Sequence, residues 1–349
     1  MNNGLRPRLE ALLQRHWWRN PPSLLSRALQ PMSVLYGALT QLHRLANPPQ
    51  TAPVPVLVVG NVVAGGAGKT PTVLAVLRLL LAAGHRPAVL SRGYGRKGKR
   101  AHLVTANDTP AVAGDEPLLI HRRSGVPVWV GSNRLALARR ACAQDPGIDV
   151  LVCDDGLQHH RLNRNVNLVV FDERGMGNGL LLPAGPLRQV WPDAGDGTVP
   201  QRVLYNAAAA STPVAGALAE RGIHWAWPLQ AWWARDASQA VPLAQLQGRP
   251  LTAAAGLAAP EKFFSMLEAA GLHIHRLPLP DHHPFDASPW PASSTEVVVT
   301  EKDAIKLRAS ANLSNDTGVT VWVVPLDFKL PEALGRDLLA LLFEPPTPP

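Results

Sequence analysis

The stretch Gly65-Gly66-Ala67-Gly68-Lys69-Thr70 decides the fold of this chain. It lies between an apolar run, Val56 to Val59, and an apolar helical pattern, Thr72 to Ala83. Glycines let backbone N–H groups surround phosphates, and the N-terminus of the following helix adds its positive dipole. A strand, a phosphate-binding loop and a helix in this order predict a P-loop nucleotide-binding core.

The residue types in this loop assign roles to individual side chains. Lys69 is expected to neutralise phosphoryl charge, and the Thr70 hydroxyl is expected to bind magnesium. A strict motif would have glycine where Val63 stands, so the turn that enters the loop must differ. A chance Gly-rich turn is the alternative, but the flanking strand and helix favour nucleotide binding. The predicted ATP-binding residues are Val63, Ala64, Gly65, Gly66, Ala67, Gly68, Lys69 and Thr70.

The kind of nucleotide follows from two absences in the sequence. Partition-type ATPases carry a lysine just before the paired glycines, where this chain has Ala64. A guanine-specific motif would need Asn/Thr-Lys-x-Asp, but the lysine of Thr300-Glu301-Lys302-Asp303 comes one place late. ATP is therefore favoured over GTP.

Apolar runs alternate with helical patterns along most of the chain. This alternation predicts an α/β fold, a mostly parallel sheet with helices on both faces, followed by a smaller C-terminal α/β lobe. The predicted segments are an N-terminal interfacial helical segment (1–50), a P-loop core (51–205), the smaller lobe (206–335) and a C-terminal helix and tail (336–349). Predicted strands of the core are Val56 to Val59, Pro87 to Leu90, Val126 to Val130, Val150 to Cys153 and Asn167 to Phe171; the lobe is predicted from Leu251 to Ala255, a helix over Glu261 to Ala270, His273 to Leu277 and Glu296 to Val299.

Composition limits the class of partner and the chemistry. The 349 residues include 34 Lys and Arg against 26 Asp and Glu, a formal net charge of +8 that suits an anionic partner such as a nucleotide, a phospholipid or a nucleic acid. The two cysteines, Cys142 and Cys153, form neither a Cys-x-x-Cys motif nor a Cys/His cluster. The sequence therefore predicts no disulfide framework and no zinc site.

The N-terminal region predicts a helix without a membrane span. Arg6 and Arg8 come without an apolar signal core, so no secretory signal is expected. Apolar residues then recur at three- and four-residue steps, which is the pattern of an interfacial helix and also of a helix packed on its own domain. The pattern alone favours the packed helix. These apolar residues are Leu24, Leu25, Leu29, Met32, Leu35, Leu39 and Leu42, interrupted by Arg27, Gln30, Gln41 and Arg44.

A pair of carboxylates follows the predicted strand that ends at Cys153. Asp154 and Asp155, with Gly156 after them, stand where a Walker B carboxylate belongs, at the carboxyl end of a strand. A turn-forming Asp-Asp-Gly is the alternative. Behind a P-loop, the pair favours a magnesium site made with Thr70.

Seven motifs occur together and in one order, and as a set they resemble the tetraacyldisaccharide 4'-kinase family over nearly the whole chain after the N-terminal helix. They are Val63-Ala-Gly-Gly-Ala-Gly-Lys-Thr-Pro71, Ser91-Arg-Gly-Tyr-Gly-Arg96, Gly114-Asp-Glu-Pro117, Asp154-Asp-Gly-Leu-Gln-His159, Leu182-Pro-Ala-Gly-Pro-Leu-Arg188, Asp281-His282 and Thr300-Glu-Lys-Asp303. The resemblance implies ATP- and Mg²⁺-dependent phosphorylation of the 4'-hydroxyl of a tetraacyldisaccharide 1-phosphate, a lipid A precursor, to give lipid IVA.

The same resemblance implies a location and partners. It places the protein on the cytoplasmic face of a bacterial inner membrane, held peripherally or monotopically through the N-terminal helix. The expected partners are the glycolipid substrate and the anionic membrane surface, with no nucleic acid and no obligate protein partner. None of this follows from composition or spacing.

Catalytic roles are likewise implied by the resemblance. Asp115 is expected to accept the proton of the sugar hydroxyl with His282 as its partner, since an imidazole can orient a carboxylate and share the proton. The residues alone would favour a helix N-cap for Asp115 and a surface histidine for His282. Further substrate or phosphate contacts are expected from Arg92, Tyr94, Arg96, His159 and Arg188, although a solvated basic loop explains the first three equally well.

One position departs from the family pattern, and two other functions stay open. The family usually has glutamate, a carboxylate implicated in magnesium handling, where this chain has Gln189, which supplies only a neutral oxygen. A P-loop kinase for another hydroxyl acceptor would share the same phosphate machinery. A nucleotide-dependent switch protein would show slow turnover and nucleotide-dependent association.

Overall fold

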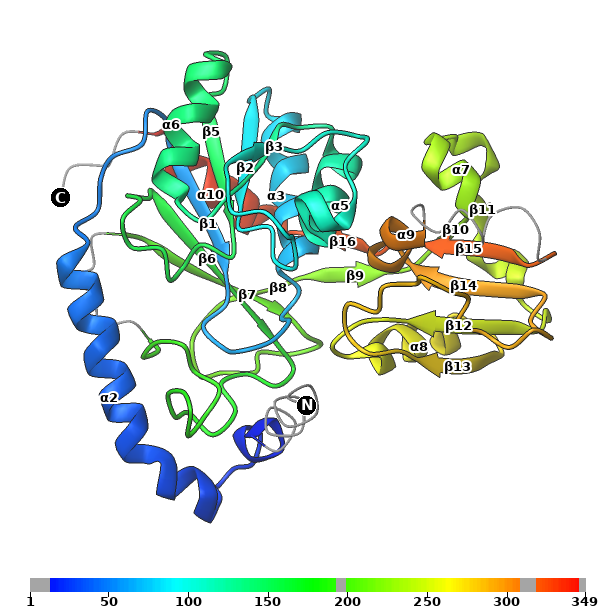
Figure 1. Ribbon diagram of the computed structural model, residues 1–349, viewed down its shortest axis with the longest axis horizontal. Coiled ribbons are helices and arrows are strands. Elements are labelled where there is room, and N and C mark those ends of the chain that lie inside the picture. The colour runs from blue at the N-terminus through cyan, green and yellow to red at the C-terminus, as the bar shows by residue number, and fades with distance from the viewer. Residues whose placement is uncertain (1–12, 193–198, 308–317, 345–349) are drawn as a thin grey trace. The chain divides into compact units, whose positions relative to one another are not determined.

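The computed structural model describes residues 13–192, 199–307 and 318–344. The chain divides into two compact units, each built from separate stretches of sequence. The first consists of Met1–Arg92, Val126–Ala219 and Leu330–Pro349, and the second of Gly93–Gly125 and Glu220–Lys329 (Figure 1). The predicted residues Arg6 and Arg8 and the Pro-rich tail from Pro345 lie outside the described residues.

The first unit is built on a parallel sheet, as the alternating pattern predicts. Its strands lie in the order β4-β2-β5-β1-β6-β7-β8, and every neighbouring pair is parallel. The central strands are buried along their whole length, as expected for a sheet covered on both faces. The strands are β1 (Val56–Gly60), β2 (Pro87–Ser91), β4 (Val128–Val130), β5 (Val150–Asp154), β6 (Val166–Asp172), β7 (Gln201–Asn206) and β8 (Ala217–Leu218).

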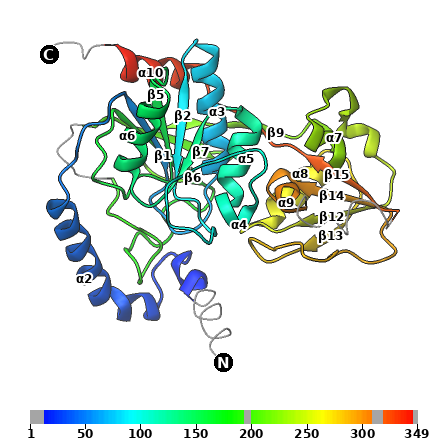
Figure 2. The same cartoon turned by 45° about the horizontal axis from the view of Figure 1, so that its top comes forward.

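Three helices cover this sheet. They are α3 (Lys69–Ala82), α6 (Arg134–Gln144) and α10 (Glu332–Phe343). α3 packs against β1, β2 and β5, while α10 returns from the end of the chain to lie against α3 and β6 (Figure 2). Leu77 and Leu80 of α3 are fully buried, so this helix is anchored in the core directly behind the phosphate loop.

The helix α2 (Leu24–Ala46) lies at the edge of the first unit (Figure 1). Most of its large apolar residues are exposed. Its buried residues are Ser26 and Ser33, and the Ser33 hydroxyl donates to the Leu181 carbonyl at 2.8 Å. Met32 and Leu35 are 57% and 61% exposed. The helix therefore docks through small polar residues, which contradicts the expectation from the pattern alone that its apolar stripe packs on the core. In the described part of the chain, no helix is long and apolar enough to span a membrane.

The second unit contains a mixed sheet in the order β11-β10-β15-β14-β12-β13. The strands from β13 to β15 are parallel, and β10 pairs antiparallel with both β15 and β11. A two-stranded ribbon of β9 and β16 belongs to the same unit. The strands of the mixed sheet and the ribbon are β9 (Glu220–Gly222), β10 (Trp225–Pro228), β11 (Val241–Pro242), β12 (Leu251–Ala255), β13 (Ile274–Pro278), β14 (Glu296–Thr300), β15 (Thr320–Val324) and β16 (Asp327–Lys329). The short strand β3 (His102–Leu103) belongs to neither of them.

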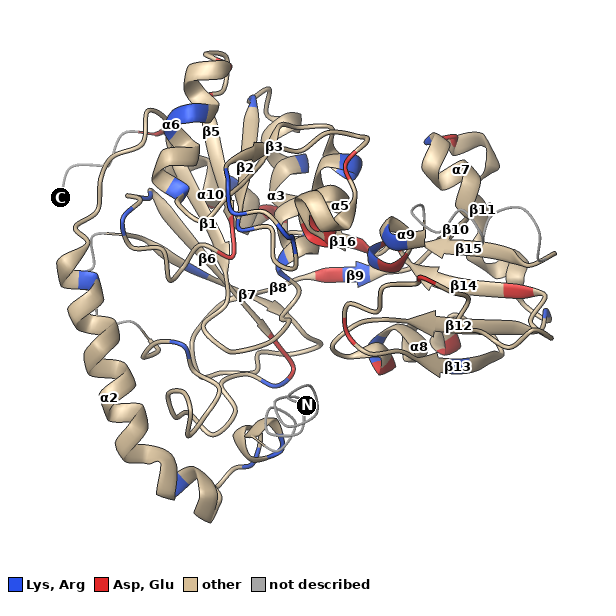
Figure 3. Cartoon of the chain, viewed as in Figure 1, with Lys and Arg blue, Asp and Glu red and all other residues tan. Residues whose placement is uncertain are grey.

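The helices of the second unit complete its core and carry its polar residues. They are α4 (Pro110–Ala113), α5 (Asp115–Ser124), α7 (Leu229–Ala234), α8 (Pro260–Ala269) and α9 (Glu301–Leu307), with short 3₁₀ turns at Ala237–Gln239 and Leu243–Leu246. α8 buries Phe263, Phe264 and Leu267 against the sheet. α5 packs against α9, and both carry acidic and basic residues (Figure 3).

The predicted strands agree with the observed ones to within one or two residues, and Leu251–Ala255 agrees in full. The observed units, unlike the predicted segments, are not continuous in sequence. Residues 93–125 cluster with the second unit although they lie early in the chain, and Leu330–Pro349 clusters with the first. The structure therefore places Asp115 in the same unit as His282, although 167 positions separate them.

Candidate active site

A polar site forms where the strands of the first unit end. In a parallel α/β sheet the carboxyl ends of the strands meet at one edge, which is where ligands bind. β1 leads into the phosphate loop, and its neighbour β5 ends at Asp154, which pairs in register with Val59. β2 ends at Ser91, β6 at Asp172 and β7 at Asn206. The sheet topology thus brings five strand ends around the loop.

The phosphate loop has the backbone that its glycines predict. Gly65 and Gly68 have φ values of 100° and 88°, a region that L side chains rarely adopt. A Cβ on Gly68 would also lie 2.1 Å from the Asn206 amide nitrogen. Thr70 is the second residue of α3. The loop is therefore held open by glycine at the positions where nothing else fits.

Val63 shows how the loop does without the glycine of the strict motif. It is fully buried and forms an antiparallel bridge with Leu187. The amide of Ala64 donates to the Pro186 carbonyl at 2.8 Å, and the amide of Arg188 donates to the Val62 carbonyl at 2.7 Å. The entry to the loop is extended and tied to the segment that carries Arg188.

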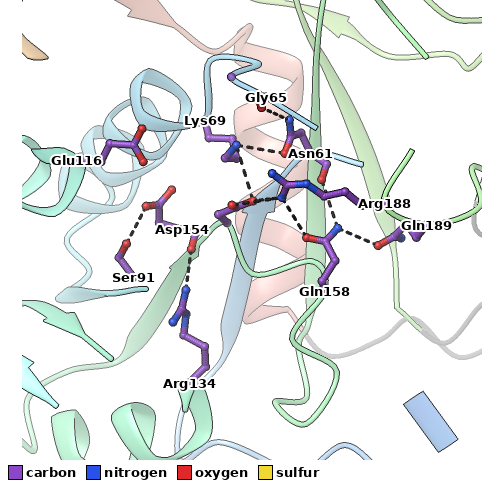
Figure 4. Close-up of polar contacts among 12 residues, drawn as sticks. Asn61, Gly65, Lys69, Ser91, Glu116, Arg134, Asp154, Gln158, Arg188 and Gln189 are labelled. Atoms are coloured by element: carbon purple, nitrogen blue, oxygen red, sulfur yellow. Dashed lines mark hydrogen bonds and ion pairs between the residues drawn. The ribbon is translucent and has the colours of Figure 1, made fainter. Parts of the chain in front are cut away.

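The ammonium group of Lys69 lies near two side-chain oxygen atoms of the protein (Figure 4). Its Nζ lies 3.1 Å from Oδ1 of Asn61 and 3.7 Å from Oδ1 of Asp155. Asn61 is fully buried, and its amide also donates to the Gly65 carbonyl at 2.9 Å. Burial alone would raise the pKa of Asp155, but the charges of Lys69 and Arg188 outweigh burial and hold that pKa below its ordinary value.

Asn61 is a site residue that the sequence reasoning missed. It links the first turn of the loop to the lysine, so it fixes the direction of the ammonium group. The sequence feature that could have identified Asn61 is its position, since it is a polar residue directly after the apolar strand β1. Strand ends of this kind carry functional side chains in open α/β sheets.

Arg188 reaches the same carboxylate from the other side. Its Nη1 lies 3.2 Å from Oδ1 and 3.3 Å from Oδ2 of Asp155 and 3.4 Å from Oε1 of Gln158. The Gln158 amide in turn donates to Oε1 of Gln189 at 3.1 Å, as Figure 4 shows. The Tyr36 hydroxyl of α2 donates to the Arg188 carbonyl at 3.0 Å. Gln189 thus lies beside the site, and α2 is bonded directly to it.

Asp154 is held deeper than Asp155. Oγ of Ser91 donates to its Oδ2 at 3.0 Å, and the buried Arg134 donates to its carbonyl at 3.4 Å (Figure 4). Nε2 of His159, a predicted substrate or phosphate contact, accepts the Arg134 amide at 3.2 Å. Burial, together with the charges of Arg134 and Arg164, lowers the pKa of His159 to about 4. His159 is therefore neutral at neutral pH.

Arg174 is a second residue that the sequence reasoning missed. It follows the end of β6, pairs with the buried Asp172 at 2.8 Å and donates to the Gly66 carbonyl at 2.7 Å. Its guanidinium also lies 4.4 Å from the centre of the Trp18 ring. It contributes a third cation beside the phosphate loop, after Lys69 and Arg188. No motif singled it out, because its place depends on β6 lying next to β1.

A buried carboxylate and an imidazole meet in the second unit. Oδ2 of Asp115 lies 2.9 Å from Nδ1 of His282, and the Asp115 side chain is 11% exposed. The N-cap of α5 is Gly114, and Asp115 is the first residue of the helix. This contradicts the alternative that Asp115 is an N-cap, and it leaves the carboxylate directed at His282.

The loops around this pair are constrained. Gly114 has a φ of 93°, and a Cβ there would lie 2.9 Å from the Tyr94 carbonyl. His282 itself has a φ of 59°, unusual for a residue with a side chain, and its amide donates to Oδ1 of Asp281 at 3.0 Å. The Tyr94 ring lies 5.5 Å from the His282 ring, while Arg96 donates within its own loop to the Arg100 carbonyl.

The remaining predicted contacts belong to different units. Arg92 is exposed just after β2 in the first unit, and Tyr94 is 71% exposed in the second. The first unit holds the predicted phosphate and metal residues, and the second holds Asp115, His282, Tyr94 and Arg96.

Comparisons with known proteins identify the family. Residues 25–342 match the family model described as tetraacyldisaccharide-1-P 4'-kinase. The tetraacyldisaccharide 4'-kinase of Methylibium petroleiphilum is 51% identical over 92% of this chain and 90% of its own. That of Leptothrix cholodnii is 47% identical over 97% and 98%.

A solved structure agrees with the fold. The crystal structure of LpxK from Aquifex aeolicus in complex with ATP is 24% identical, matches with a TM-score of 0.74, and covers 92% of this chain and 100% of its own. At this identity it supports the architecture, an α/β core with a second, smaller lobe. Family model and relatives cover the phosphate loop, the Asp154-Asp155 pair and the Asp115–His282 pair together, so the chain belongs to the tetraacyldisaccharide 4'-kinase family.

Proposed function

We propose that this chain transfers the γ-phosphate of ATP to the 4'-hydroxyl of a tetraacyldisaccharide 1-phosphate, forming lipid IVA. The observation that carries the proposal is the contact of 2.9 Å between Asp115 and His282. A phosphate loop alone also serves switches and hydrolases. A buried carboxylate oriented by an imidazole supplies the base that an acceptor hydroxyl needs.

The first unit provides the groups for the phosphoryl side of the reaction. Lys69, Arg174 and Arg188 lie at or beside the loop, and each is already paired with a protein carboxylate. When ATP binds, its phosphates replace part of this pairing for Lys69 and Arg188. Fixed cations directed at a transferring phosphoryl group stabilise the charge that it carries.

The residues fit a magnesium ion. Mg²⁺ is usually bound by one or two carboxylates together with substrate phosphates and water, and Asp154, Asp155 and Thr70 match this set. Across the described residues there is no cluster of three or more His, Cys, Asp or Glu that could hold a metal by itself. Mg²⁺ bound by these residues together with ATP would neutralise phosphoryl charge.

The second unit provides the acceptor base. Nδ1 of His282 donates to Oδ2 of Asp115, so this hydrogen bond holds the carboxylate through Oδ2. We assign Oδ1 to the proton of the 4'-hydroxyl as the oxygen attacks the γ-phosphorus and the bond to ADP breaks. General base catalysis of this kind typically contributes about 10²–10⁴-fold in rate.

The helix α2 is proposed as the membrane contact. Its outward face carries Met32, Leu35, Leu39 and Leu42, each more than half exposed, while serines face the protein. A helix with apolar residues on its solvent side is suited to the interface of a bilayer. Replacing both Leu35 and Leu39 by Asp should abolish flotation with anionic phospholipid vesicles. The same change at the exposed Leu218 of β8 should not.

The activity is tested by following the transfer of radioactive phosphate from ATP. Purified protein in detergent is incubated with γ-³²P-ATP, Mg²⁺ and tetraacyldisaccharide 1-phosphate, and label is sought in the lipid. Transfer that disappears in Lys69→Ala supports the proposal. Label that reaches only water while ATP still binds favours the switch, and transfer to an added non-lipid alcohol but not to the disaccharide favours another acceptor.

A further inference from the structure

A buried lysine lies behind Asp115 in the second unit. Nζ of Lys306 lies 3.9 Å from Oδ2 of Asp115 and 3.2 Å from Oδ1 of Asp303, and the lysine side chain is only 4% exposed. The ammonium also lies 5.2 Å from the centre of the buried Phe285 ring. Burying an ammonium costs several kcal/mol unless it is well paired. The fold therefore keeps this charge at a cost, and its position calls for an explanation.

Asp303 holds the lysine in place. This carboxylate is fully buried and accepts the Gly256 amide at 3.2 Å and the Thr300 hydroxyl at 2.7 Å. A Cβ on Gly256 would lie 2.9 Å from Oδ1 of Asp303, so the approach of the backbone depends on glycine. Lys306 comes one turn later on α9 and spans the distance from this fixed anion to Asp115.

Asp303 is sufficient to pair with a buried lysine, and a purely structural ion pair would need nothing more. The lysine reaches the Asp115 oxygen that also faces His282. At 3.9 Å the lysine contributes an ion pair and not a hydrogen bond. The His282 hydrogen bond and this ion pair both act on Oδ2, and together they limit the rotation of the carboxylate.

The other charges around the pair are arranged differently. Nζ of Lys302 lies 3.4 Å from Oε1 of Glu116 and 3.6 Å from Oδ1 of Asp281. Burial alone would lower the pKa of Lys302, but Glu116 and Asp281 outweigh it and raise that pKa. Glu301 is paired with Arg123 at the opposite end of α5. Among the described contacts of Asp115, Lys306 is the one lysine that reaches its carboxylate within 4 Å.

We propose that Lys306 is a positioning residue for the phosphoryl transfer: anchored by Asp303, it holds Oδ2 of Asp115 together with His282, so that the carboxylate keeps its orientation toward the acceptor hydroxyl. The inference rests on the proposed role of Asp115. It also assigns a role to the Thr300–Asp303 motif. Asp303 of this motif anchors the lysine, and the helix α9 that begins there carries Lys306.

The test is the steady-state kinetics of lipid phosphorylation in Lys306→Met, which keeps the length of the side chain and removes its charge. We expect kcat to fall by up to about 100-fold, because Asp115 loses its orientation, while the KM values for ATP and lipid stay unchanged. Lys306→Arg should restore the wild-type kcat, and Lys329→Met, a change at an exposed lysine of the same unit, should not alter it.

Folding is controlled by a matched pair of changes. Lys306→Met alone leaves Asp303 buried without its cation, so Asp303→Asn/Lys306→Met removes both charges together. The double variant should fold with wild-type ATP affinity and still show the lower kcat. A wild-type kcat in both variants would show a structural lysine and overturn the proposal. Transfer that survives Asp115→Asn would instead refute the base itself, so the two failures are distinguishable.

Discussion

The two units gather side chains of opposite charge. The first gathers cations, Lys69, Arg174 and Arg188, at the carboxyl edge of a parallel sheet. The second gathers carboxylates, Asp115, Asp281 and Asp303, and balances them with two lysines and a histidine. In the proposed function this difference divides the work of the kinase, with one unit binding the anionic nucleotide and the other preparing the acceptor hydroxyl.

The two sites also differ in how the chain builds them. In the first unit, Asn61, Asp155 and Arg174 follow the ends of neighbouring strands, which bring them together. In the second unit the key residues come from a helix start, a loop and another helix, and Asp115 and His282 lie 167 positions apart. The first site is thus a consequence of topology, and the second depends on the packing of α5 against α9.

The largest effect is expected from Asp115→Asn. If the second unit supplies the base, lipid phosphorylation should fall by about 10²–10⁴-fold, while ATP affinity, a property of the first unit, should not change. Label transfer and equilibrium binding of ATP measure the two quantities. A parallel loss of ATP affinity would break the division between the units.

Asn61→Ala is the reciprocal change in the first unit. It removes the buried amide that links Lys69 to the Gly65 carbonyl, so the lysine loses its direction while its charge remains. Misplacing a catalytic group in this way costs up to about 10²-fold. The loss should appear in kcat/KM for ATP, with the KM for the lipid unchanged. An effect confined to the lipid KM would contradict the assignment of Asn61.

Gln189→Glu tests the proposed magnesium site of the first unit. The residue accepts a hydrogen bond from the Gln158 amide, which a carboxylate also accepts, so the change adds charge beside Asp155 without removing a contact. We expect half-maximal activity at a several-fold lower Mg²⁺ concentration, since hard cations prefer charged oxygen ligands. Gln189→Met is the matched control and should not lower the Mg²⁺ requirement.

The smallest effect concerns stability and pH. The folded pKa of His159, about 4, lies below its ordinary value of 6.5. Between those values the unfolded chain takes up the proton first, so the contribution of neutral His159 is present above pH 6.5 and is lost as pH falls toward 4. His159→Gln keeps an acceptor for the Arg134 amide and should show a smaller decrease of Tm over this window. Equal slopes would indicate that His159 is not buried neutral.

Much of the first site is readable from the chain because it is local. The loop from Val63 to Thr70 and the Asp154-Asp155 pair each follow an apolar run, and the strands that precede them are neighbours in the sheet. Arg174 was not predicted, because its contact with the Gly66 carbonyl depends on β6 lying next to β1. Asn61 was missed although its partners, Gly65 and Lys69, are local. The bridge of Val63 to Leu187 explains why the missing glycine is tolerated.

The sequence by itself determined the nature of the groups: the order of strands and helices, the phosphate loop, the paired aspartates and the apolar stripe of α2. Only the tertiary structure decided where those groups point. It turned the α2 leucines away from the core, placed Arg188 on Asp155, and brought Lys306 and His282 to one oxygen of Asp115. The physical reason is that periodicity and turn chemistry act over a few residues. Burial and ion pairing act between residues that only folding brings together.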